Sequence, residues 1–336
     1  MAQRPHVVLA FSPAIHRGLV RPAQLERLRS LCSLQDAEPL AAFDDPRADA
    51  LLADAEILLT GWGCRRIDAA VLARAPRLRA IVHAAGTVKG HVTNECFERG
   101  VVISSAAAAN AVPVAEYTVA AILLANKRVF ALRERYREER KFKFWAAEMP
   151  GLGNLHKTVG LLAASRVGRR VVELLQPFDL RIVLHDPTLE DAEIRALGAE
   201  PVSLDELFSQ SDVVSLHAPL VPATRGLIDA RLLARMPDGA TFVNTARGGL
   251  VDGEALEAEL VSGRIWAVID TTEPEVLPSD SPLYALPNVF LTPHIAGAMG
   301  RETERLVDLA LDEIERFVGG EPLAHPVHHE EWERTA

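Results

Sequence analysis

Cysteine is scarce in this sequence, and its scarcity excludes two kinds of protein. Cys32, Cys64 and Cys96 are the three cysteines among 336 residues, and they are widely spaced without a CxxC pair. Such spacing supports neither a disulfide framework nor a structural zinc site. We therefore expect free structural thiols and no bound metal.

Positive charge is also in short supply, because 36 lysines and arginines face 46 aspartates and glutamates, for a formal net charge of -10. Nucleic acids and anionic membranes both require a positive footprint, so neither is expected as a partner. One stretch does concentrate arginine: Arg133, Arg135, Arg137 and Arg140, interleaved with Glu134, Glu138 and Glu139. Because these glutamates offset most of the charge, we interpret the stretch as a solvated or subunit-facing helix surface.

Long hydrophobic runs are missing as well. A membrane-spanning helix needs about 20 apolar residues, and the longest candidate, 112–125, contains Pro113 and Glu116 and is followed by Asn126. The first residues lead into an apolar segment without the basic region, hydrophobic stretch and cleavage site of a signal peptide. We therefore expect no membrane helix, no export and a cytoplasmic location.

What the sequence does contain is an ordinary globular composition, with 49% hydrophobic and 24% charged residues. Its length fits two domains of roughly 150 residues each. Short β-rich runs alternate with helical patterns, which is typical of parallel sheets covered by helices on both faces. The sequence therefore predicts an α/β protein with two doubly wound parallel sheets. The strands expected in the first sheet are 7–11, 56–60, 78–83 and 101–104.

A long helical region, 112–140, separates this series from a second one. The strands expected in the second sheet are 159–163, 181–185, 213–217, 241–244, 265–269 and 289–291. Six strands with intervening helices fit a complete dinucleotide-binding fold. Ser203 and Glu206 have the spacing of a capping box and mark the start of one helix.

The first turn of the second series departs from the usual dinucleotide-binding pattern. Residues 158–178 read as a strand, a tight turn and a helix, the context in which G-x-G-x-x-G places a helix N-terminus against a pyrophosphate. Here 163–168 read AASRVG, so Gly168 alone remains of the three glycines. Ala163 and Ser165 are small, and the hydroxyl can hydrogen-bond a phosphate, so we predict a pyrophosphate site with weakened affinity. Its predicted contacts are Ser165, Arg166, Val167 and Gly168.

An acidic residue follows the next expected strand. Asp186 occupies the position at which a carboxylate accepts hydrogen bonds from the ribose hydroxyls and repels a 2′-phosphate. This predicts NAD as the cofactor in preference to NADP. The alternative interpretation of Asp186 is a turn residue before Pro187.

Polar segments follow three later strands, with NTARGG at 244–249, DTTEPE at 270–275 and TPHIAG at 292–297. Because the carboxyl ends of parallel strands meet at one sheet edge, where ligands bind, these segments are expected to lie together. An arginine, a carboxylate and a histidine would then face the same crevice.

At this point the sequence resembles the D-isomer-specific 2-hydroxyacid dehydrogenases, which include glyoxylate and hydroxypyruvate reductases and phosphoglycerate dehydrogenases. The resemblance rests on NTARG, on SLHAPL at 215–220, on LPNVFLTPHIAG at 286–297 and on 110–116, and it covers essentially the whole chain. It implies a flavodoxin-like substrate-binding domain, 1–108 with 299–336, and a Rossmann NAD-binding domain, 109–298. It also implies a homodimer.

The resemblance implies Arg247, Glu275 and His294 as the catalytic set of an NAD-dependent oxidoreductase that interconverts a 2-ketoacid and a D-2-hydroxyacid. Arg247 would pair with the substrate carboxylate and carbonyl oxygen, for which a planar guanidinium is suited. His294 would donate a proton to the carbonyl oxygen as hydride arrives from NADH, while a carboxylate orients its ring. Glu275 is favoured for that carboxylate because the family's acid lies five residues after the strand-ending aspartate, here Asp270.

That choice leaves an alternative open. The family usually has proline after this glutamate, whereas this chain has Val276, so Glu273 remains a second candidate. Further cofactor contacts implied by the resemblance are His217, Pro219, Thr224, Thr245, Ala246, Asp270 and Gly297, with Asp270 at the nicotinamide carboxamide.

The loop 83–89 occupies the place where family members present backbone N–H groups to the substrate carboxylate. The resemblance therefore implies substrate contacts at Ala85, Gly86 and Thr87, in addition to Arg247, and nearby Trp62 is a further candidate. The usual aspartate-asparagine pair is absent, and Thr87 and Lys89 are present instead. This difference favours either a bulkier or doubly charged substrate, or a solvent-exposed Lys89.

Two other functions remain open. One is a dehydrogenase-fold binding protein resembling the C-terminal-binding-protein corepressors, in which NADH controls assembly. The other is a catalytically weak family member in which the altered turn at Ala163 and Ser165 has lost cofactor affinity. The sequence does not identify the ketoacid, because side-chain specificity depends on the shape of the pocket.

Overall fold

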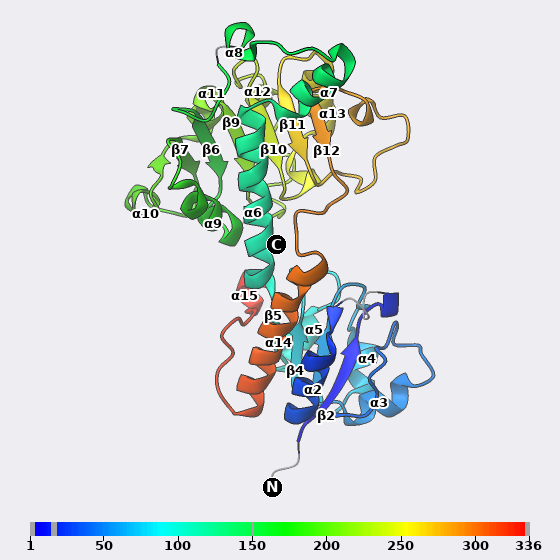
Figure 1. The fold of residues 1–336 in the computed structure, drawn as a ribbon. Coiled ribbons are helices and arrows are strands. Elements are labelled where there is room, and N and C mark those ends of the chain that lie inside the picture. Colours follow the sequence, from blue (N-terminus) through cyan, green and yellow to red (C-terminus); the bar gives the residue numbers. More distant parts are fainter. Residues whose placement is uncertain (1–3, 15–18, 150, 333–336) are drawn as a thin grey trace. The chain divides into compact units, whose positions relative to one another are not determined.

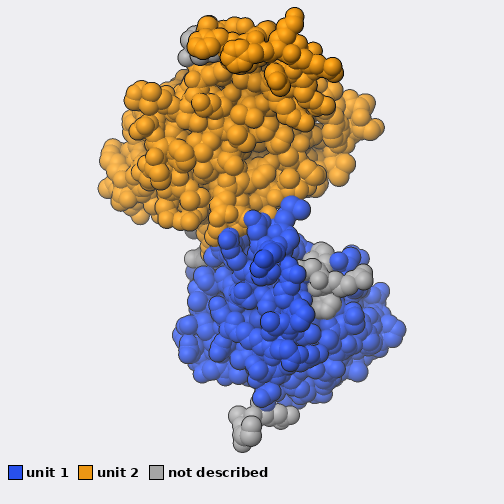
Figure 2. All heavy atoms as spheres, in the orientation of Figure 1, with its two compact units in different colours: residues 1–111, 298–336 blue, residues 112–297 orange. Residues whose placement is uncertain are grey.

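The computed structural model describes residues 4–14, 19–149 and 151–332. The chain divides into two compact units, 1–111 with 298–336 and 112–297, which Figure 2 shows in separate colours. The sequence predicts these divisions at 108/109 and 298/299. Residues 1–3, 15–18, 150 and 333–336, which the predicted domains include, lie outside the described residues.

The first unit contains a five-stranded parallel sheet with the order β2-β1-β3-β4-β5. Its strands are β1 His6–Ala10, β2 Ser33–Leu34, β3 Ile57–Thr60, β4 Ala80–His83 and β5 Val102–Ser105. This is the predicted flavodoxin-like order. Successive residues of a strand point to opposite faces, so Val7 and Leu9 enter one core cluster and Val8 and Ala10 another. The sheet is therefore buried on both faces.

Helices from both ends of the chain cover this sheet (Figure 1). Its helices are α2 Pro22–Leu31, α3 Ala48–Asp54, α4 Ala69–Arg74, α5 Asn94–Glu98, α14 Thr303–Val318, α15 His329–Trp332 and the 3-10 turn η3 Gly300–Glu302. Val307, Ala310, Leu311 and Ile314 of α14 have the three- and four-residue spacing of one helical face. They join Val7 and Leu9 in one cluster. A helix near the C-terminus therefore completes the hydrophobic core of the N-terminal strands.

The second unit contains a seven-stranded parallel sheet with the order β12-β11-β10-β9-β6-β7-β8. Its strands are β6 Thr158–Leu162, β7 Arg181–His185, β8 Glu200–Pro201, β9 Val213–Leu216, β10 Thr241–Asn244, β11 Trp266–Ile269 and β12 Val289–Leu291. The strand order reverses between β6 and β9, which is the switch point where doubly wound sheets bind dinucleotides. The predicted α/β class with two parallel sheets is confirmed.

Helices cover both faces of the second sheet (Figure 1). They are α7 Val129–Glu139, α8 Trp145–Glu148, α9 Arg166–Leu175, α10 Asp191–Ala196, α11 Leu204–Gln210, α12 Ala230–Leu233, α13 Gly253–Val261 and the 3-10 turns η1 Gly248–Leu250 and η2 Pro282–Tyr284. The Ser203 hydroxyl accepts from the Glu206 amide, and the Glu206 carboxylate accepts from the Ser203 amide and hydroxyl. The predicted capping box is therefore confirmed.

The expectation that Pro113 and Glu116 interrupt the longest apolar run, 112–125, is wrong. The apolar run interrupted by Pro113 forms a continuous helix, α6 Ala107–Asn126, which begins in the first unit and continues into the second. By length and composition it is long and apolar enough to cross a membrane, a test that the core helix of a non-membrane protein also passes. Ala115, Ala121 and Ile122 of α6 pack in the second core, which accounts for its apolar character.

The remaining differences from the predicted strands concern length. Every predicted strand is present, with ends shifted by a residue or two in several cases. The two-residue strands β2 and β8 escaped the sequence analysis because a segment that short carries no measurable apolar periodicity.

Candidate active site

The three segments that are predicted to be catalytic leave neighbouring strands at one edge of the second sheet. Arg247 follows β10, Asp270 follows β11 and His294 follows β12, and these strands pair side by side. Because the pairs are parallel, all three segments start from the carboxyl edge. The expectation that they would share an edge is thus met by the topology.

Asp270 organises the segment that carries His294. Asp270 is buried, with 2% of its surface exposed. Its Oδ1 accepts hydrogen bonds from the Thr292 hydroxyl at 2.6 Å and the Ile295 amide at 2.8 Å, and its Oδ2 accepts from the Ala296 amide at 2.9 Å. The Asp270 carbonyl also accepts from the His294 amide at 2.9 Å. One carboxylate therefore fixes the backbone on both sides of the histidine.

His294 and Glu275 form a pair at this edge. His294 Nδ1 lies 2.5 Å from Glu275 Oε1, and both side chains are exposed. His294 has a left-handed backbone, with a φ of 53°. With Nδ1 engaged by a carboxylate, the proton that the ring can transfer lies on Nε2. The geometry is that of an oriented general acid.

Glu273, the second candidate, has a different partner. Glu273 Oε1 lies 2.6 Å from Nη1 of Arg225. A Cβ on Gly248 or Gly249 would collide with Thr272 or Glu273, so these glycines let the 271–275 loop pack against the arginine motif. The structure thus brings Glu275, and not Glu273, to the histidine.

Arg247 is partly buried beside this loop. Its Nη1 donates to the Ala246 carbonyl at 2.7 Å, and the described residues accept no other hydrogen bond from the guanidinium, so its remaining N–H groups can donate to a ligand. Burial lowers the pKa of Arg247, and the charge of Glu275 opposes that shift. A guanidinium remains charged under these conditions, so Arg247 provides a fixed positive charge.

The turn after β6 resembles a pyrophosphate cradle despite its missing glycines. Ser165 is the N-cap of α9, and its hydroxyl accepts from the Gly168 amide at 3.3 Å. A hydroxyl that accepts this bond still has its own proton to donate to a phosphate. A Cβ on Gly168 would collide with the Ala163 carbonyl, so this glycine is required. Arg166 is exposed and Val167 half-buried at the start of the helix.

The contacts of Asp186 fit both interpretations from the sequence, the turn residue and the ribose-binding carboxylate. Its Oδ2 accepts from the Ala164 amide at 2.8 Å, and its Oδ1 accepts from the amide and hydroxyl of Thr188 at 2.8 and 2.7 Å. Burial works to raise the pKa of Asp186, but these hydrogen bonds, led by Thr188, lower it below its ordinary value. The carboxylate is therefore ionised and closes its own turn, and the donors of the described residues leave one of its lone pairs unused.

The other predicted cofactor residues have structural partners. The His217 ring is buried beside the Gly168 turn, with Nε2 3.1 Å from the Ser215 hydroxyl, and burial lowers its pKa to about 3. The Thr224 hydroxyl lies 2.6 Å from the Pro219 carbonyl and accepts from Val221. The buried Thr245 hydroxyl bonds to Thr118 of α6 at 2.8 Å. Ala246 and Gly297 are half-buried at the sheet edge.

Sequence analysis did not predict the side chain that contacts Thr292, a hydrogen-bond donor to Asp270. The Tyr117 hydroxyl of α6 lies 2.8 Å from the Thr292 hydroxyl, which donates to Asp270. Burial is the main cause of a raised pKa of Tyr117. The adjacent polar residues Tyr117 and Thr118 in a mostly apolar helix were the available signal.

The predicted substrate loop lies at the carboxyl end of β4 in the first unit. Ala85 is buried and Gly86 and Thr87 are half-buried. The Ser105 hydroxyl lies 2.5 Å from the Gly86 carbonyl and 3.3 Å from that of Ala85. Trp62 is half-buried beside the small cluster of Ala106, Ala298 and Leu306.

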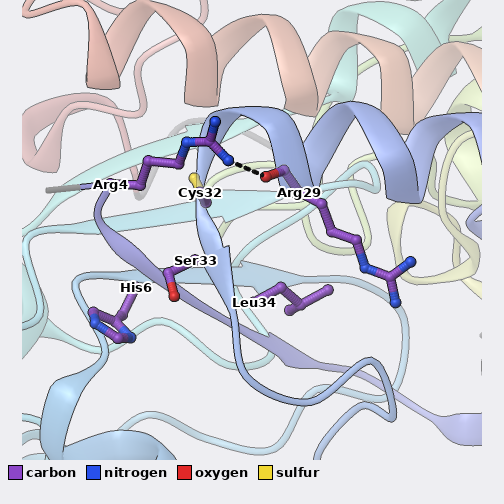
Figure 3. A pocket seen from close by; sticks show the side chains of 6 residues that line it. All are labelled: Arg4, His6, Arg29, Cys32, Ser33 and Leu34. Carbon is purple, nitrogen blue, oxygen red and sulfur yellow. Dashed lines mark hydrogen bonds between the residues drawn. The ribbon is translucent and has the colours of Figure 1, made fainter. Parts of the chain in front are cut away.

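The cavity of about 460 Å³ in this unit is a separate feature (Figure 3). It is lined by Arg4, His6, Arg29, Cys32, Ser33 and Leu34. His6 and Ser33 begin β1 and β2, so the cavity lies at the amino edge of the sheet, opposite the edge that carries the substrate loop. Arg29 pairs with Glu26, and Arg4 donates to the Arg29 carbonyl.

The chain is similar to known dehydrogenases over most of its length. A family model described as D-isomer specific 2-hydroxyacid dehydrogenase, NAD binding domain, matches residues 119–296. Glyoxylate reductase from Aeropyrum pernix is 33% identical over 317 residues, which is 91% of this chain and 93% of the relative. D-3-phosphoglycerate dehydrogenase from Mycobacterium bovis is 32% identical over 300 residues, 87% of this chain and 55% of the relative. The chain thus spans about half the length of the phosphoglycerate dehydrogenases it matches.

A solved structure gives the same result. D-Lactate dehydrogenase from Aquifex aeolicus, complexed with NAD and lactic acid, is 25% identical and superposes with a TM-score of 0.74, covering 94% of this chain and 96% of that chain. The prediction of an NAD site is confirmed by the family match to residues 119–296. The chain therefore belongs to the D-isomer specific 2-hydroxyacid dehydrogenase family.

Proposed function

We propose that this protein is an NAD-dependent dehydrogenase that interconverts a 2-ketoacid and a D-2-hydroxyacid. The observation that carries the proposal is the His294–Glu275 pair at 2.5 Å, on the same sheet edge as a partly buried Arg247. An oriented imidazole beside a fixed positive charge is what reduction of a ketoacid carbonyl requires. The glyoxylate reductase and D-lactate dehydrogenase relatives bear names of this reaction class.

The residues at the switch point fit NAD. The pyrophosphate would lie at the start of α9, where Gly168 has no room for a Cβ and the Ser165 hydroxyl can donate. The ribose would meet Asp186, whose charge disfavours a 2′-phosphate. Three donors of the described residues reach the Asp270 carboxylate, which leaves one acceptor position for the nicotinamide carboxamide. When bound, the nicotinamide supplies or accepts the hydride at the substrate carbon.

The protein's own residues account for the remaining requirements. The Arg247 guanidinium binds the substrate carboxylate and holds the carbonyl oxygen. As the carbonyl carbon gains hydride, His294 Nε2 transfers its proton to the oxygen, and Glu275 stabilises the ring through Nδ1. In the oxidative direction the neutral ring takes the hydroxyl proton back. One ketoacid, one NADH and one proton thus give one hydroxyacid and one NAD⁺.

The proposal is tested with a panel of 2-ketoacids, namely glyoxylate, hydroxypyruvate, pyruvate, phenylpyruvate and branched ketoacids, assayed with NADH and with NADPH. We expect reduction of at least one ketoacid, with a higher kcat/KM for NADH. His294→Gln should then lower kcat by about 100- to 10,000-fold while NADH fluorescence titration gives an unchanged Kd. NADH binding with no turnover on the panel would support the binding-protein alternative, and absence of NADH binding the weak-member alternative.

We also infer that the protein forms a homodimer through the region 129–149, defined here as the arm. No residue of α7 is buried, and Tyr136, Phe142 and Phe144 are 60%, 89% and 72% exposed. Exposed apolar clusters of this kind mark interaction sites. The arm carries both charge signs, with pairs such as Arg137–Glu134 and Arg135–Glu139, so a second copy is a complementary partner. Light scattering should give a dimer mass, and Phe142→Glu with Phe144→Glu a monomer.

A further inference from the structure

Two buried histidines lie beneath the predicted substrate loop and have no part in the reaction above. Thr60, His83 and Ser105 end the strands β3, β4 and β5, and His83 pairs in register with each of the other two. Their exposed fractions are 0%, 3% and 7%, and that of His91, which follows the loop, is 4%. The rings of His83 and His91 lie 4.4 Å apart, at an interplanar angle of 41°.

Thr60 bridges the two rings. Its hydroxyl oxygen lies 2.9 Å from His83 Nδ1 and 3.3 Å from His91 Nε2. A hydroxyl has one proton and two lone pairs. The Val82 carbonyl also lies 3.5 Å from this oxygen, but the His83 contact is the shortest of the three, so the proton positions in the hydroxyl and the two rings depend on one another.

The loop itself sets the direction of this chain of hydrogen bonds. His83 also hydrogen-bonds the backbone of Thr87, and because that bond raises the pKa of His83, the ring is the donor. Burial, followed by the neighbouring His91, nevertheless lowers the pKa of His83 well below its ordinary range, and burial lowers the pKa of His91 to about 4. Both rings are neutral at pH 7 and each has a single N–H. His83 thus uses its N–H on Thr87 and accepts from Thr60, which accepts from His91.

These hydrogen bonds complete the anchoring of the loop on the side that faces the protein interior. Ser105 holds the carbonyl of Gly86, with that of Ala85 also in reach, and His83 holds the carbonyl of Thr87. Among the described residues, the amides of Ala85, Gly86 and Thr87 have no hydrogen-bond partner. Successive amides not engaged by the protein suit an anion such as a carboxylate. The loop carbonyls thus accept hydrogen bonds from buried side chains, and the loop amides can donate to a ligand.

We propose that His83 and, through it, Thr60 and His91 are positioning residues that fix the loop 84–89 so that its amides bind the substrate carboxylate. The proposal rests on the proposed function. None of the three side chains needs to touch the substrate, because they act on the loop: His83 directly precedes it, His91 follows it, and the Thr60 hydroxyl joins the two rings. Their expected signature is a weaker affinity for the ketoacid with a nearly unchanged rate at saturation.

Two substitutions at His83 separate positioning from packing. His83→Gln places an amide donor near the position of Nε2 and so keeps the bond to Thr87. His83→Asn places a carbonyl oxygen near Nδ1, keeps the bond from Thr60 and loses Thr87. With the ketoacid that the wild type reduces best, we expect His83→Asn to raise KM about tenfold or more and His83→Gln about threefold or less.

For both variants kcat should stay within threefold and the Kd for NADH should not change. Thr60→Val, which removes the bridging hydroxyl at similar volume, should raise KM severalfold. The matched control is Thr93→Val in the same unit, where the buried hydroxyl donates to the Ile67 carbonyl and the loop is not involved. It should lower the melting temperature and leave KM unchanged.

Long-range ¹H–¹⁵N spectra at pH 7 check the proton positions independently of activity. In the wild type both rings should be neutral and carry the proton on Nε2, and Thr60→Val should remove this fixed pattern. An unchanged KM in folded His83→Asn and Thr60→Val, or equal KM values for the Asn and Gln variants, would overturn the positioning role. A wild type that reduces no ketoacid would instead overturn the proposed function, and the positioning role with it.

Discussion

The loops that carry the predicted catalytic and substrate residues are anchored differently in the two units. In the second unit, the carboxylate of Asp270 holds 292–297, and that of Asp186 holds the turn after β6. In the first unit, neutral groups hold 84–89, namely the Ser105 hydroxyl and the His83 ring. The predicted catalytic and cofactor loops are thus anchored by charged groups, and the predicted substrate loop by neutral ones.

The backbone explains the difference. His294 and Ala163 have left-handed φ values of 53° and 75°, whereas no residue of the fully described loop 84–89 has a positive φ. The left-handed region costs an ordinary residue about 1–2 kcal/mol. In both strained segments the next amide, of Ile295 or Ala164, donates at 2.8 Å to an aspartate that ends the neighbouring strand. Hydrogen bonds to a charged acceptor are the stronger kind, so at these two positions a charged acceptor offsets the strain.

The largest effect is expected from Asp270→Asn. The amide keeps one acceptor oxygen and turns an N–H₂ group toward the donors that the carboxylate now satisfies. We expect kcat to fall by about 100-fold, because small misplacements of a catalytic group have effects of that size, and the free energy of unfolding to fall by about 3 kcal/mol. Steady-state kinetics and urea unfolding measure both.

Asp186→Asn is the matched control in the other charged anchor. It should raise the Kd for NADH while leaving kcat at saturating cofactor within threefold. If Asp270→Asn had a kcat within twofold of the wild type, the carboxylate anchor would not be what positions His294.

The second prediction concerns pH and the neutral anchor. Burial lowers the pKa of His91 to about 4, against about 6.5 in an unfolded chain. The resulting stability is complete above pH 6.5 and is lost as the pH falls from 6.5 toward 4, because the unfolded ring binds the proton first. The hydrogen bonds of Asp186 keep its pKa below the ordinary value, so that carboxylate stays ionised in this window.

The measurement is urea unfolding at pH 7.0 and 4.5. We expect the wild type to lose about 2 kcal/mol more than His91→Asn over this interval. Equal losses in the two proteins would show that His91 is not held neutral, and the neutral anchor would then differ less from the charged one.

Much of this organisation could be predicted from sequence, for identifiable reasons. The strands with their strong apolar runs, the order of motifs and the meeting of Arg247, Asp270 and His294 at one edge follow from local patterns and from the rule for parallel sheets. The short strands β2 and β8 could not be predicted, and α6 begins at Ala107, before the expected start of the helical region at 112, because Pro113 is tolerated inside the helix.

The anchors lay beyond sequence reasoning because they join residues far apart in the chain. Asp270 was expected to face the cofactor, and nothing local shows that its oxygens also hold Thr292, Ile295 and Ala296. The role of Thr60 depends on strand register, which places it beside His83. Motif spacing favoured Glu275 over Glu273 by a residue count, whereas the structure shows a different partner for each.

A smaller effect is expected from Ser105→Ala. The variant loses the bond to the Gly86 carbonyl and the acceptor for the Ala107 amide, so stability should fall by about 1 kcal/mol and KM for the ketoacid should rise severalfold. Ser104→Ala is the control, since the Ser104 hydroxyl is buried without a hydrogen-bond partner among the described residues. It should be neutral or slightly stabilising. If both variants had the same KM, the hydroxyl anchor would have no effect on the loop.

The smallest effect, and the most direct test of the strain argument, is expected from Ala163→Gly. Glycine adopts a φ of 75° without the clash of a Cβ, but it gives up about 0.5–1 kcal/mol of backbone entropy relative to alanine. Against a strain of about 1–2 kcal/mol, the net result should be a stabilisation of about 0.5–1 kcal/mol. Calorimetry should show a melting temperature higher by about 1–4 °C. Gly168→Ala in the same turn should do the opposite, because its Cβ would collide with the Ala163 carbonyl. A destabilised Ala163→Gly would mean that the Asp186 anchor already removes the strain, so that charge at this turn serves the cofactor and not the backbone.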